Sequence, residues 1–119
     1  MINEKISSVI ENLRKYQWET KDEKLLQEEL HKVFLKDFNY IKEYRLDNKN
    51  ILDFFNEELG IVIECKTQGT SMQIYRQLKR YAEFPQVKAI LLVSSKPMGL
   101  PAIIESKPAF IYLLGKNWL

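Results

Sequence analysis

The sequence has few of the features that small proteins use to compensate for a weak hydrophobic core. Its only cysteine is Cys65, so no disulfide can form within the chain and no cysteine cluster can bind zinc. No apolar run reaches the length of about 20 residues that spans a bilayer. The first residues carry charges where a signal peptide requires an apolar segment. We therefore expect a cytoplasmic protein without membrane association, whose core forms from its 45% apolar residues alone.

Glycine and proline are also scarce, with four of each among 119 residues. No linker-like, low-complexity or repeated segment interrupts the chain, so we expect one domain over residues 1–119. The net charge is only +2, which excludes a strongly basic nucleic-acid coat and a strongly acidic tail. This balance conceals an asymmetry, because residues 1–66 sum to −3 and residues 67–119 to +5. The cations of the second half could face phosphates or could simply be solvated.

Hydrophobic periodicity predicts the elements of the first half. Apolar residues recur at steps of three and four over roughly 2–15 and again to about residue 36, which predicts two amphipathic helices. Short extended segments follow at 40–46, 51–55 and 60–67, separated by turn-prone residues. We expect them to form three strands in antiparallel succession.

The second half of the sequence predicts a crossover connection between two strands. Helical spacing returns over 70–83, and a buried strand follows at 87–95. A strand that follows a crossover helix is expected to run parallel to the strand before that helix. A last extended segment occupies 109–114. The predicted fold is α/β, a mixed sheet flanked by helices in the order α α β β β α β β.

Three charged residues interrupt the apolar strands. Glu64 and Lys66 are two apart in one strand and so point to the same face, while Asp53 lies in the strand before it. If the two strands form a hairpin, Asp53 lies opposite or diagonal to Glu64. Two converging carboxylates beside a lysine are suited to Mg²⁺ or Mn²⁺, which prefer oxygen ligands. The alternative is a surface ion pair between Glu64 and Lys66, with Asp53 as a polar residue near a turn.

The pattern D53-x10-E64-C65-K66, preceded by two helices and followed by a helix and a strand, resembles the core of the PD-(D/E)XK phosphodiesterase superfamily, which has the restriction-endonuclease-like fold. Gln77 and Tyr81 form Q-x-x-x-Y in the following helix, which is similar to the signature of RecB-type nucleases. The resemblance covers roughly residues 20–95. It departs from the family at Leu52, where the motif's name has proline.

The resemblance implies roles for these residues. Asp53 and Glu64 would bind the metal, Lys66 would orient or deprotonate the attacking water, and Gln77 and Tyr81 would flank the active site. A further acidic residue from the helix before the sheet often joins such sites. Glu23 is the first choice for this ligand, with Glu28 and Glu29 as alternatives, although each is also explained as a solvated helix residue.

The remaining candidates carry less information. Arg76, Lys79 and Arg80 lie beside the Q-x-x-x-Y positions and either contact phosphates or form an ordinary polar helix face. His31 has no cysteine or second histidine nearby, so we expect a solvated or capping residue rather than a ligand. Cys65 points to the face opposite Glu64, where it is expected to act as a small buried hydrophobic residue.

These observations together predict a Mg²⁺- or Mn²⁺-dependent nuclease that hydrolyses phosphodiester bonds, with DNA favoured over RNA as the substrate. A small domain without recognisable base-reading elements leaves little surface for sequence readout. A homodimer or a larger protein partner would then supply specificity. The alternative is a nucleic-acid-binding or assembly module that keeps the nuclease fold without catalysis. A third interpretation is a structural domain in which the three charged residues form a salt-bridge cluster.

Overall fold

The computed structural model describes residues 1–115. The chain begins with helix α1 (Ile2–Arg14) and helix α2 (Glu23–Leu30), which continues into a π-helical turn, η1 (His31–Leu35). Both predicted helices of the first half are confirmed, and the second ends in a wider turn than an α-helix has. None of the helices within residues 1–115 is long and apolar enough to cross a membrane.

A six-stranded mixed sheet forms the centre of the molecule, in the order β1-β2-β3-β4-β6-β5. The first three strands are antiparallel in succession, as predicted. Helix α3 (Ser71–Ala82) connects β3 to β4, and these two strands are parallel, which confirms the predicted crossover. The strands are β1 (Ile41–Arg45), β2 (Ile51–Asn56), β3 (Ile61–Lys66), β4 (Ala89–Ser94), β5 (Ile103–Ile104) and β6 (Lys107–Leu113).

The predicted order α α β β β α β β was wrong in one respect, because it omitted β5. This two-residue strand pairs antiparallel with the start of β6. The two residues between them, Glu105 and Ser106, both have positive φ angles, 48° and 65°. A two-residue turn with these angles connects the strands of a tight hairpin, and its residues are usually Asn-Gly or Asp-Gly. Glu-Ser carries no such signal, so sequence patterning could not find the strand.

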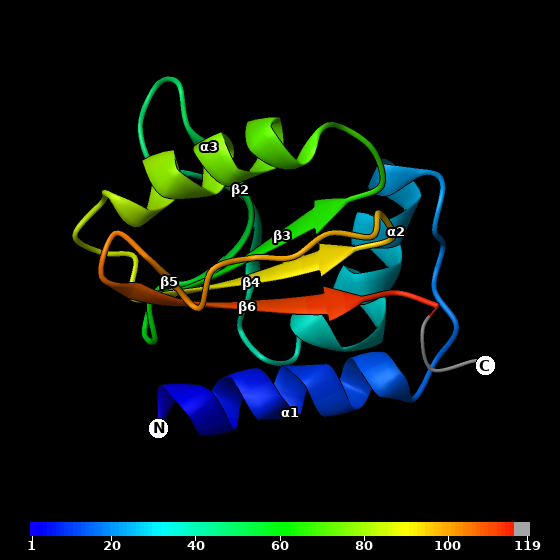
Figure 1. Ribbon diagram of the computed structural model, residues 1–119. Coiled ribbons are helices and arrows are strands. Elements are labelled where there is room, and N and C mark those ends of the chain that lie inside the picture. The colour runs from blue at the N-terminus through cyan, green and yellow to red at the C-terminus, as the bar shows by residue number, and fades with distance from the viewer. Residues whose placement is uncertain (116–119) are drawn as a thin grey trace.

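Helices cover both faces of the sheet, with α3 on one face and α1 and α2 on the other (Figure 1). One apolar cluster joins α1 and α2 to the sheet and includes Leu13, Leu26 and Cys65. A second cluster lies under α3 and includes Leu78 and Ile90. Strands β3 and β4 are buried along almost their whole length because both of their faces are covered. Glu64, within β3, is therefore far from bulk water and only 1% exposed.

The turn between β2 and β3 depends on Gly60. Its φ is +73°, in the left-handed region that favours glycine. A Cβ there would lie 2.5 Å from the Lys88 Cγ and 2.8 Å from the Gln86 carbonyl oxygen. The Gly60 carbonyl also accepts a hydrogen bond from the Lys88 N–H at 2.7 Å. This close approach holds the turn against the start of β4 and keeps β2 and β3 in register.

Gly60→Ala should therefore lower the free energy of unfolding by more than about 1 kcal/mol, because both the backbone angle and the available space oppose a side chain. Gly99→Ala is the matched control, since its Cβ would meet nothing within 4 Å. Chemical denaturation of both variants measures the difference. Equal effects of the two substitutions would contradict this account of the turn.

Candidate active site

The candidate site forms where β2 separates from β3. The register of these strands pairs Phe54 with Ile63, and its continuation places Asp53 opposite Glu64. The ladder stops before that position, whereas β3 continues to pair with β4 as far as Lys66. Strand β2 thus diverges while β3 stays in the sheet. We call this break in the β2–β3 backbone ladder, at Asp53 and Glu64, the gap.

The two carboxylates replace the missing ladder across this gap. The Asp53 N–H donates a hydrogen bond to the Glu64 Oε2 at 2.6 Å, and the Cys65 N–H donates to the Asp53 Oδ2 at 2.8 Å. Each carboxylate therefore reaches to the other strand. The second oxygen of each, Asp53 Oδ1 and Glu64 Oε1, accepts no hydrogen bond from any residue within 1–115. One oxygen of each carboxylate thus has no hydrogen-bond partner among these residues.

The site is electrostatically unfavourable for two negative charges. Burial raises the pKa of Asp53 from 3.8 to about 6, against the opposing effects of the Cys65 N–H and Lys66. Burial also raises the pKa of Glu64 well above its usual value, and repulsion from Asp53 raises it further. Such shifts arise where carboxylates share a poorly solvated site without a compensating charge. The pair would be stabilised by a cation.

Lys66 does not supply that compensation by direct contact. It is half-buried and lowers the pKa of both Asp53 and Glu64, which places it within electrostatic range of the pair. No ion pair within 4.0 Å joins it to either carboxylate among the described residues. This arrangement does not match the interpretation of the three residues as a salt-bridge cluster. The ammonium group is free to interact with something else near the carboxylates.

The structure distinguishes the three helix glutamates. The Glu23 Oε1 accepts a hydrogen bond from the Thr67 N–H at 3.1 Å, one residue beyond the end of β3. Glu23 also raises the pKa of both Asp53 and Glu64. In contrast, Glu29 accepts a hydrogen bond from the Glu19 N–H, and Glu28 is exposed. Of the three, Glu23 is the one whose side chain is bonded to the end of β3.

The donor set suits a hard divalent cation held by two carboxylates. No group of three or more His, Cys, Asp and Glu side chains in residues 1–115 has an arrangement that could hold a metal. Asp53 and Glu64 converge, while Glu23 is held at Thr67. Mg²⁺ is commonly bound through one or two carboxylates and completes its shell with waters and substrate phosphates. The free carboxylate oxygens and the shared burial of Asp53 and Glu64 fit such an ion.

Helix α3 places Gln77 and Tyr81 on the same side of the sheet as the carboxylates. The Tyr81 hydroxyl donates a hydrogen bond to the Ile51 carbonyl at 3.2 Å. Burial raises the Tyr81 pKa, and the nearby Glu64 and Asp53 raise it further, whereas a hydrogen bond with Gln77 lowers it. Tyr81 therefore ties α3 to the start of β2, two residues before Asp53. The proton of its hydroxyl is engaged in this bond.

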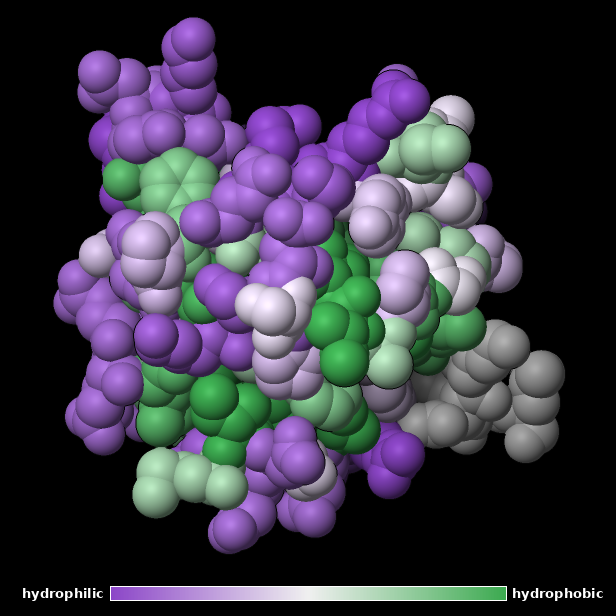
Figure 2. All heavy atoms as spheres, turned by 60° about the vertical axis from the view of Figure 1, so that its left-hand side comes forward, coloured by the Kyte–Doolittle hydropathy of each residue, from purple (hydrophilic) through white to green (hydrophobic). Residues whose placement is uncertain are grey.

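A basic pocket lies between α3 and the loop after β3, and Lys66 lines it from the end of the strand that carries Glu64. It has a volume of about 400 Å³, and its lining includes the cations Lys66, Arg76 and Arg80 but no acidic residue. Gln77 also lines it. Of the three predicted phosphate contacts, Arg76 and Arg80 line this pocket. Lys79 does not, and it forms ion pairs with Glu83 at 3.4 Å and with Glu105 at 3.6 Å. Hydrophilic residues dominate the upper part of the surface in Figure 2, where α3 lies.

Sequence reasoning missed Glu43. In the register of β1 with β2, Glu43 lies opposite Asp53, although this pair is not one of the bonded pairs of the two strands. Glu43 has a φ of 55°, raises the pKa of Asp53, and forms an exposed ion pair with Lys24 at 3.9 Å. The position of Glu43 opposite Asp53 could have been inferred by extending the predicted antiparallel pairing from the strand at 51–55 to the strand at 40–46.

The expectations for His31 and Cys65 can also be compared with the structure. Cys65 is fully buried in the cluster under α1 and α2, as predicted. His31 is the C-cap residue of α2, in agreement with one of the two expected roles, and it is half-buried rather than freely solvated. Its ring stacks on Phe54 with centroids 6.0 Å apart, and burial together with Lys42 and Lys36 lowers its pKa. The half-buried side chain of His31 packs on the α2 side of the sheet.

No protein-family model, curated protein or solved structure matches the chain. The resemblance to the PD-(D/E)XK superfamily therefore depends on the residues and their arrangement.

The elevated pKa of Asp53 predicts a pH-dependent stability. The folded protein holds this proton more tightly than the unfolded chain, so the contribution of Asp53 is fully present below about pH 4 and is lost as the pH rises through about 6. The loss is on the order of 3 kcal/mol. In the absence of metal, the melting temperature of Asp53→Asn should exceed that of the wild type, and the difference should increase as the pH rises from 4 to 7. A melting-temperature difference that does not change with pH would contradict the assignment.

Proposed function

We propose that this protein is a metal-dependent nuclease that hydrolyses phosphodiester bonds. The observation that carries the proposal is the meeting of Asp53 and Glu64 across the gap between β2 and β3, with Lys66 nearby and unpaired among the described residues. A restriction-endonuclease-like fold is part of the proposal, and the mixed sheet with helices on both faces is compatible with it.

Asp53 and Glu64 would hold Mg²⁺ or Mn²⁺ through the oxygens that make no hydrogen bond to residues 1–115. The cation would stabilise negative charge on the scissile phosphate and lower the pKa of water at the site. Burial of both carboxylates keeps bulk water away and strengthens their interaction with a cation. Glu23, bonded to the Thr67 N–H, would hold the end of β3 in position.

Lys66 would act on the reacting groups themselves. Its side chain shares a face of β3 with Glu64 and lines the basic pocket. An ammonium group there would donate hydrogen bonds to the attacking water or to a phosphate oxygen as negative charge develops in the transition state. Gln77, which lines the same pocket, would orient the substrate.

The basic pocket supports a nucleic-acid substrate. Lys66, Arg76 and Arg80 contribute three cations, and no carboxylate lines the pocket to repel phosphates. Contacts of this type hold the backbone of a nucleic acid without reading its sequence. We propose DNA rather than RNA, and a second copy of the chain or a larger partner as the source of specificity.

The catalytic proposal predicts a clear effect of substitution. Purified wild type should cleave plasmid, single-stranded or branched DNA with Mg²⁺ or Mn²⁺, and Glu64→Gln and Lys66→Ala should each reduce the rate by about 100-fold or more. Glu28→Gln is the matched control, because Glu28 lies on the same helix as Glu23 but is exposed. Melting curves would show that each variant is folded.

Two outcomes would change the interpretation. Cleavage that survives both Glu64→Gln and Lys66→Ala would show that the site is assigned wrongly. DNA that is bound but never cut with either metal would favour the alternative, a binding or assembly module that keeps the fold.

The basic pocket makes a separate prediction about binding. Arg76→Ala and Arg80→Ala should each weaken DNA binding and reduce the slope of log affinity against log salt by about one. Lys79→Ala is the matched control, because Lys79 lies on the same helix but is paired with Glu83 and Glu105. Fluorescence anisotropy at several salt concentrations measures the slopes. An equal loss for Lys79→Ala would contradict the assignment of the pocket.

A further inference from the structure

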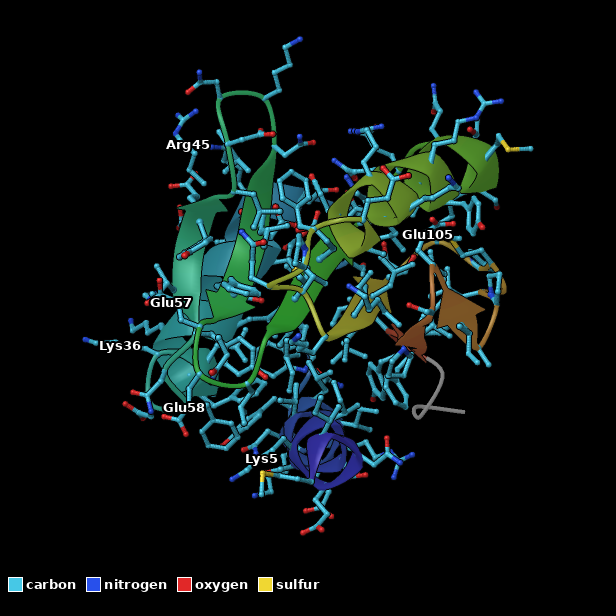
Figure 3. The ribbon with its side chains drawn as sticks, turned by 90° about the vertical axis from the view of Figure 1, so that its left-hand side faces the viewer. Lys5, Lys36, Arg45, Glu57, Glu58 and Glu105 are labelled. Carbon is cyan, nitrogen blue, oxygen red and sulfur yellow. The ribbon has the colours of Figure 1, made fainter. Side chains whose placement is uncertain are left out.

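The β1–β2 hairpin projects from the sheet beside the candidate active site. Its tip, residues 46–50, joins β1 to β2, and Asp53 lies three residues further along the chain. The bond from the Tyr81 hydroxyl to the Ile51 carbonyl fixes the base of the tip against α3. Figure 3 shows the hairpin tip at the upper left, beside Arg45, and α3 at the upper right. Both elements therefore lie on one side of the molecule, next to the proposed site.

The hairpin tip is held by its own hydrogen bonds. The Asp47 Oδ1 accepts from the Lys49 and Asn50 N–H groups, each at 2.8 Å, and the Leu46 N–H donates to the Asn50 carbonyl at 2.8 Å. The Asn50 side chain donates to both carboxylate oxygens of Asp47, at 3.1 and 3.2 Å. The Asp47 carboxylate is thus turned back into the tip. A tip that is ordered in advance loses less entropy when a partner binds.

The remaining side chains of this segment are cationic or amide groups that point to solvent. Arg45 and Lys49 are exposed, and neither forms an ion pair within residues 1–115. Arg45 donates one hydrogen bond, to the Asn48 carbonyl at 3.4 Å, out of the five that a guanidinium group can make. The Asn48 side chain is also exposed. The segment therefore offers two cations and an amide to a partner.

Helix α3 presents cations on the flank that faces the hairpin. Lys79 points to the other flank, where it pairs with Glu105 between β5 and β6. The two arginines of α3 line the basic pocket instead, on the flank where Gln77 bonds to Tyr81. Figure 2 shows hydrophilic residues along the upper surface, where both elements lie. Cations from the hairpin and from α3 thus border the same end of β2 and β3.

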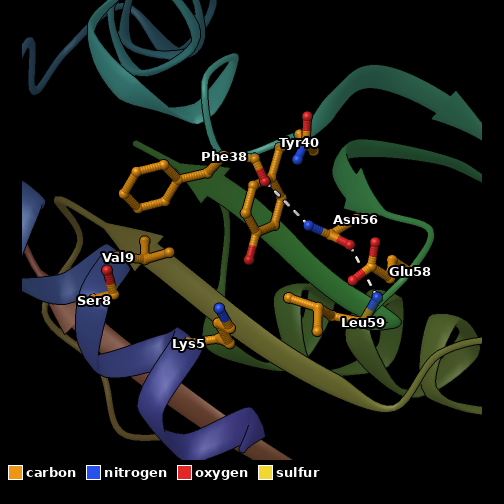
Figure 4. A pocket seen from close by; sticks show the side chains of 9 residues that line it. Lys5, Ser8, Val9, Phe38, Tyr40, Asn56, Glu58 and Leu59 are labelled. Atoms are coloured by element: carbon orange, nitrogen blue, oxygen red, sulfur yellow. Dashed lines mark hydrogen bonds between the residues drawn. The ribbon is translucent and has the colours of Figure 1, made fainter.

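The opposite end of the molecule has a mixed charge. Figure 3 shows Lys36, Glu57 and Glu58 at the end away from Arg45. The pocket of about 320 Å³ at that end is lined by both Lys5 and Glu58 (Figure 4). Carboxylates there would repel phosphates, whereas the hairpin tip and α3 would attract them. The charge pattern therefore places a polyanion at the end that carries the proposed site.

The shape of the hairpin distinguishes between nucleic acids. The major groove of B-form DNA is about 12 Å wide and about 8.5 Å deep, and it admits a two-stranded β-ribbon. The three residues from Asn50 to Asp53 alone span about 10 Å in an extended chain. The tip can therefore reach base edges while a sugar–phosphate backbone lies at the level of Asp53. The major groove of A-form RNA is too deep and narrow for such readout, and a single strand has no groove.

We infer that the hairpin tip enters the major groove of duplex DNA while the backbone of one strand lies along the basic pocket. Arg45 and Lys49 would contact phosphates at the edges of the groove, and Asn48 would face the base edges. The inference rests on the proposed function, because it takes Asp53 and Glu64 as the point where the backbone is cut. It adds the substrate class, double-stranded DNA, and the element that recognises it.

Fluorescence anisotropy of the full chain without divalent metal measures binding in the absence of cleavage. The ligands are a labelled DNA duplex, one of its strands alone, and the RNA duplex of the same sequence. The wild type should bind the DNA duplex about tenfold more tightly than either of the others. Lys49→Ala should weaken binding of the DNA duplex about threefold to tenfold and leave binding of the single strand unchanged.

Two further variants separate the hairpin from the pocket. Lys36→Ala is the matched control, because Lys36 is an exposed lysine at the opposite end of the molecule (Figure 3), and it should change neither affinity. Arg76→Ala should weaken binding of the duplex and of the single strand alike, since the basic pocket would hold the backbone of either. The Lys49 side chain makes no ion pair within residues 1–115, so Lys49→Ala should melt like the wild type.

The groove is identified by blocking one groove at a time. Glucosyl groups on the C5 atoms of cytosines project into the major groove and should weaken binding of the duplex to the wild type. Netropsin, which occupies the minor groove, should not compete. Competition by netropsin without an effect of the glucosyl groups would overturn the inference. Equal affinity for duplex and single-stranded DNA, or an unchanged duplex affinity in Lys49→Ala, would also overturn it.

These results are separate from those that test the nuclease. Wild type that binds duplex DNA through Lys49 but never cuts it with Mg²⁺ or Mn²⁺ would refute catalysis and support the hairpin as a DNA contact. Wild type that cuts duplex DNA while Lys49→Ala binds it with unchanged affinity would refute the role of the hairpin alone.

Discussion

The two reciprocal hydrogen bonds between β2 and β3 are the interaction on which the candidate site depends. Where the backbone ladder stops, the carboxylates of Asp53 and Glu64 bond to the N–H groups of the opposite strand. A buried backbone donor needs a partner, so the diverging strands require acceptors at these positions. Neutral side chains could supply those acceptors. Carboxylates satisfy the same donors but concentrate negative charge in a poorly solvated gap, which is a cost that a cation would offset.

The surroundings of this gap are arranged by elements that are distant in sequence. Helix α3 is capped by Thr70 and Gln73, each of whose side chains accepts a hydrogen bond from the backbone N–H of the other residue. Its other end is tied to β2 by the bond from Tyr81 to the Ile51 carbonyl. With both ends fixed, the helix presents Arg76 and Arg80 to the pocket beside Lys66. The acidic first half and the basic second half of the chain therefore meet at one end of β3.

The opposite end of these strands has a different chemistry. A pocket of about 320 Å³ lies there, lined by Val9, Phe38 and Leu59 together with polar residues that include Lys5 and Glu58. Gly60 and Asn56 shape the β2–β3 turn at this end of the hairpin. The same hairpin thus adjoins a basic pocket at one end and a pocket of mixed apolar and charged lining at the other.

The sequence alone determined the major elements, because helices and strands follow from local periodicity. It also nominated Asp53, Glu64 and Lys66, since charges in apolar strands are conspicuous and a hairpin sets their register. Tertiary structure decided what depends on distances between elements. It placed Glu23 rather than Glu28 or Glu29 at Thr67, paired Lys79 with Glu83 and Glu105, and brought Glu43 to face Asp53. It also buried the Tyr40 hydroxyl without a hydrogen-bond partner among residues 1–115. None of these contacts has a local signature, because each joins side chains whose approach is set by the packing of helices and strands.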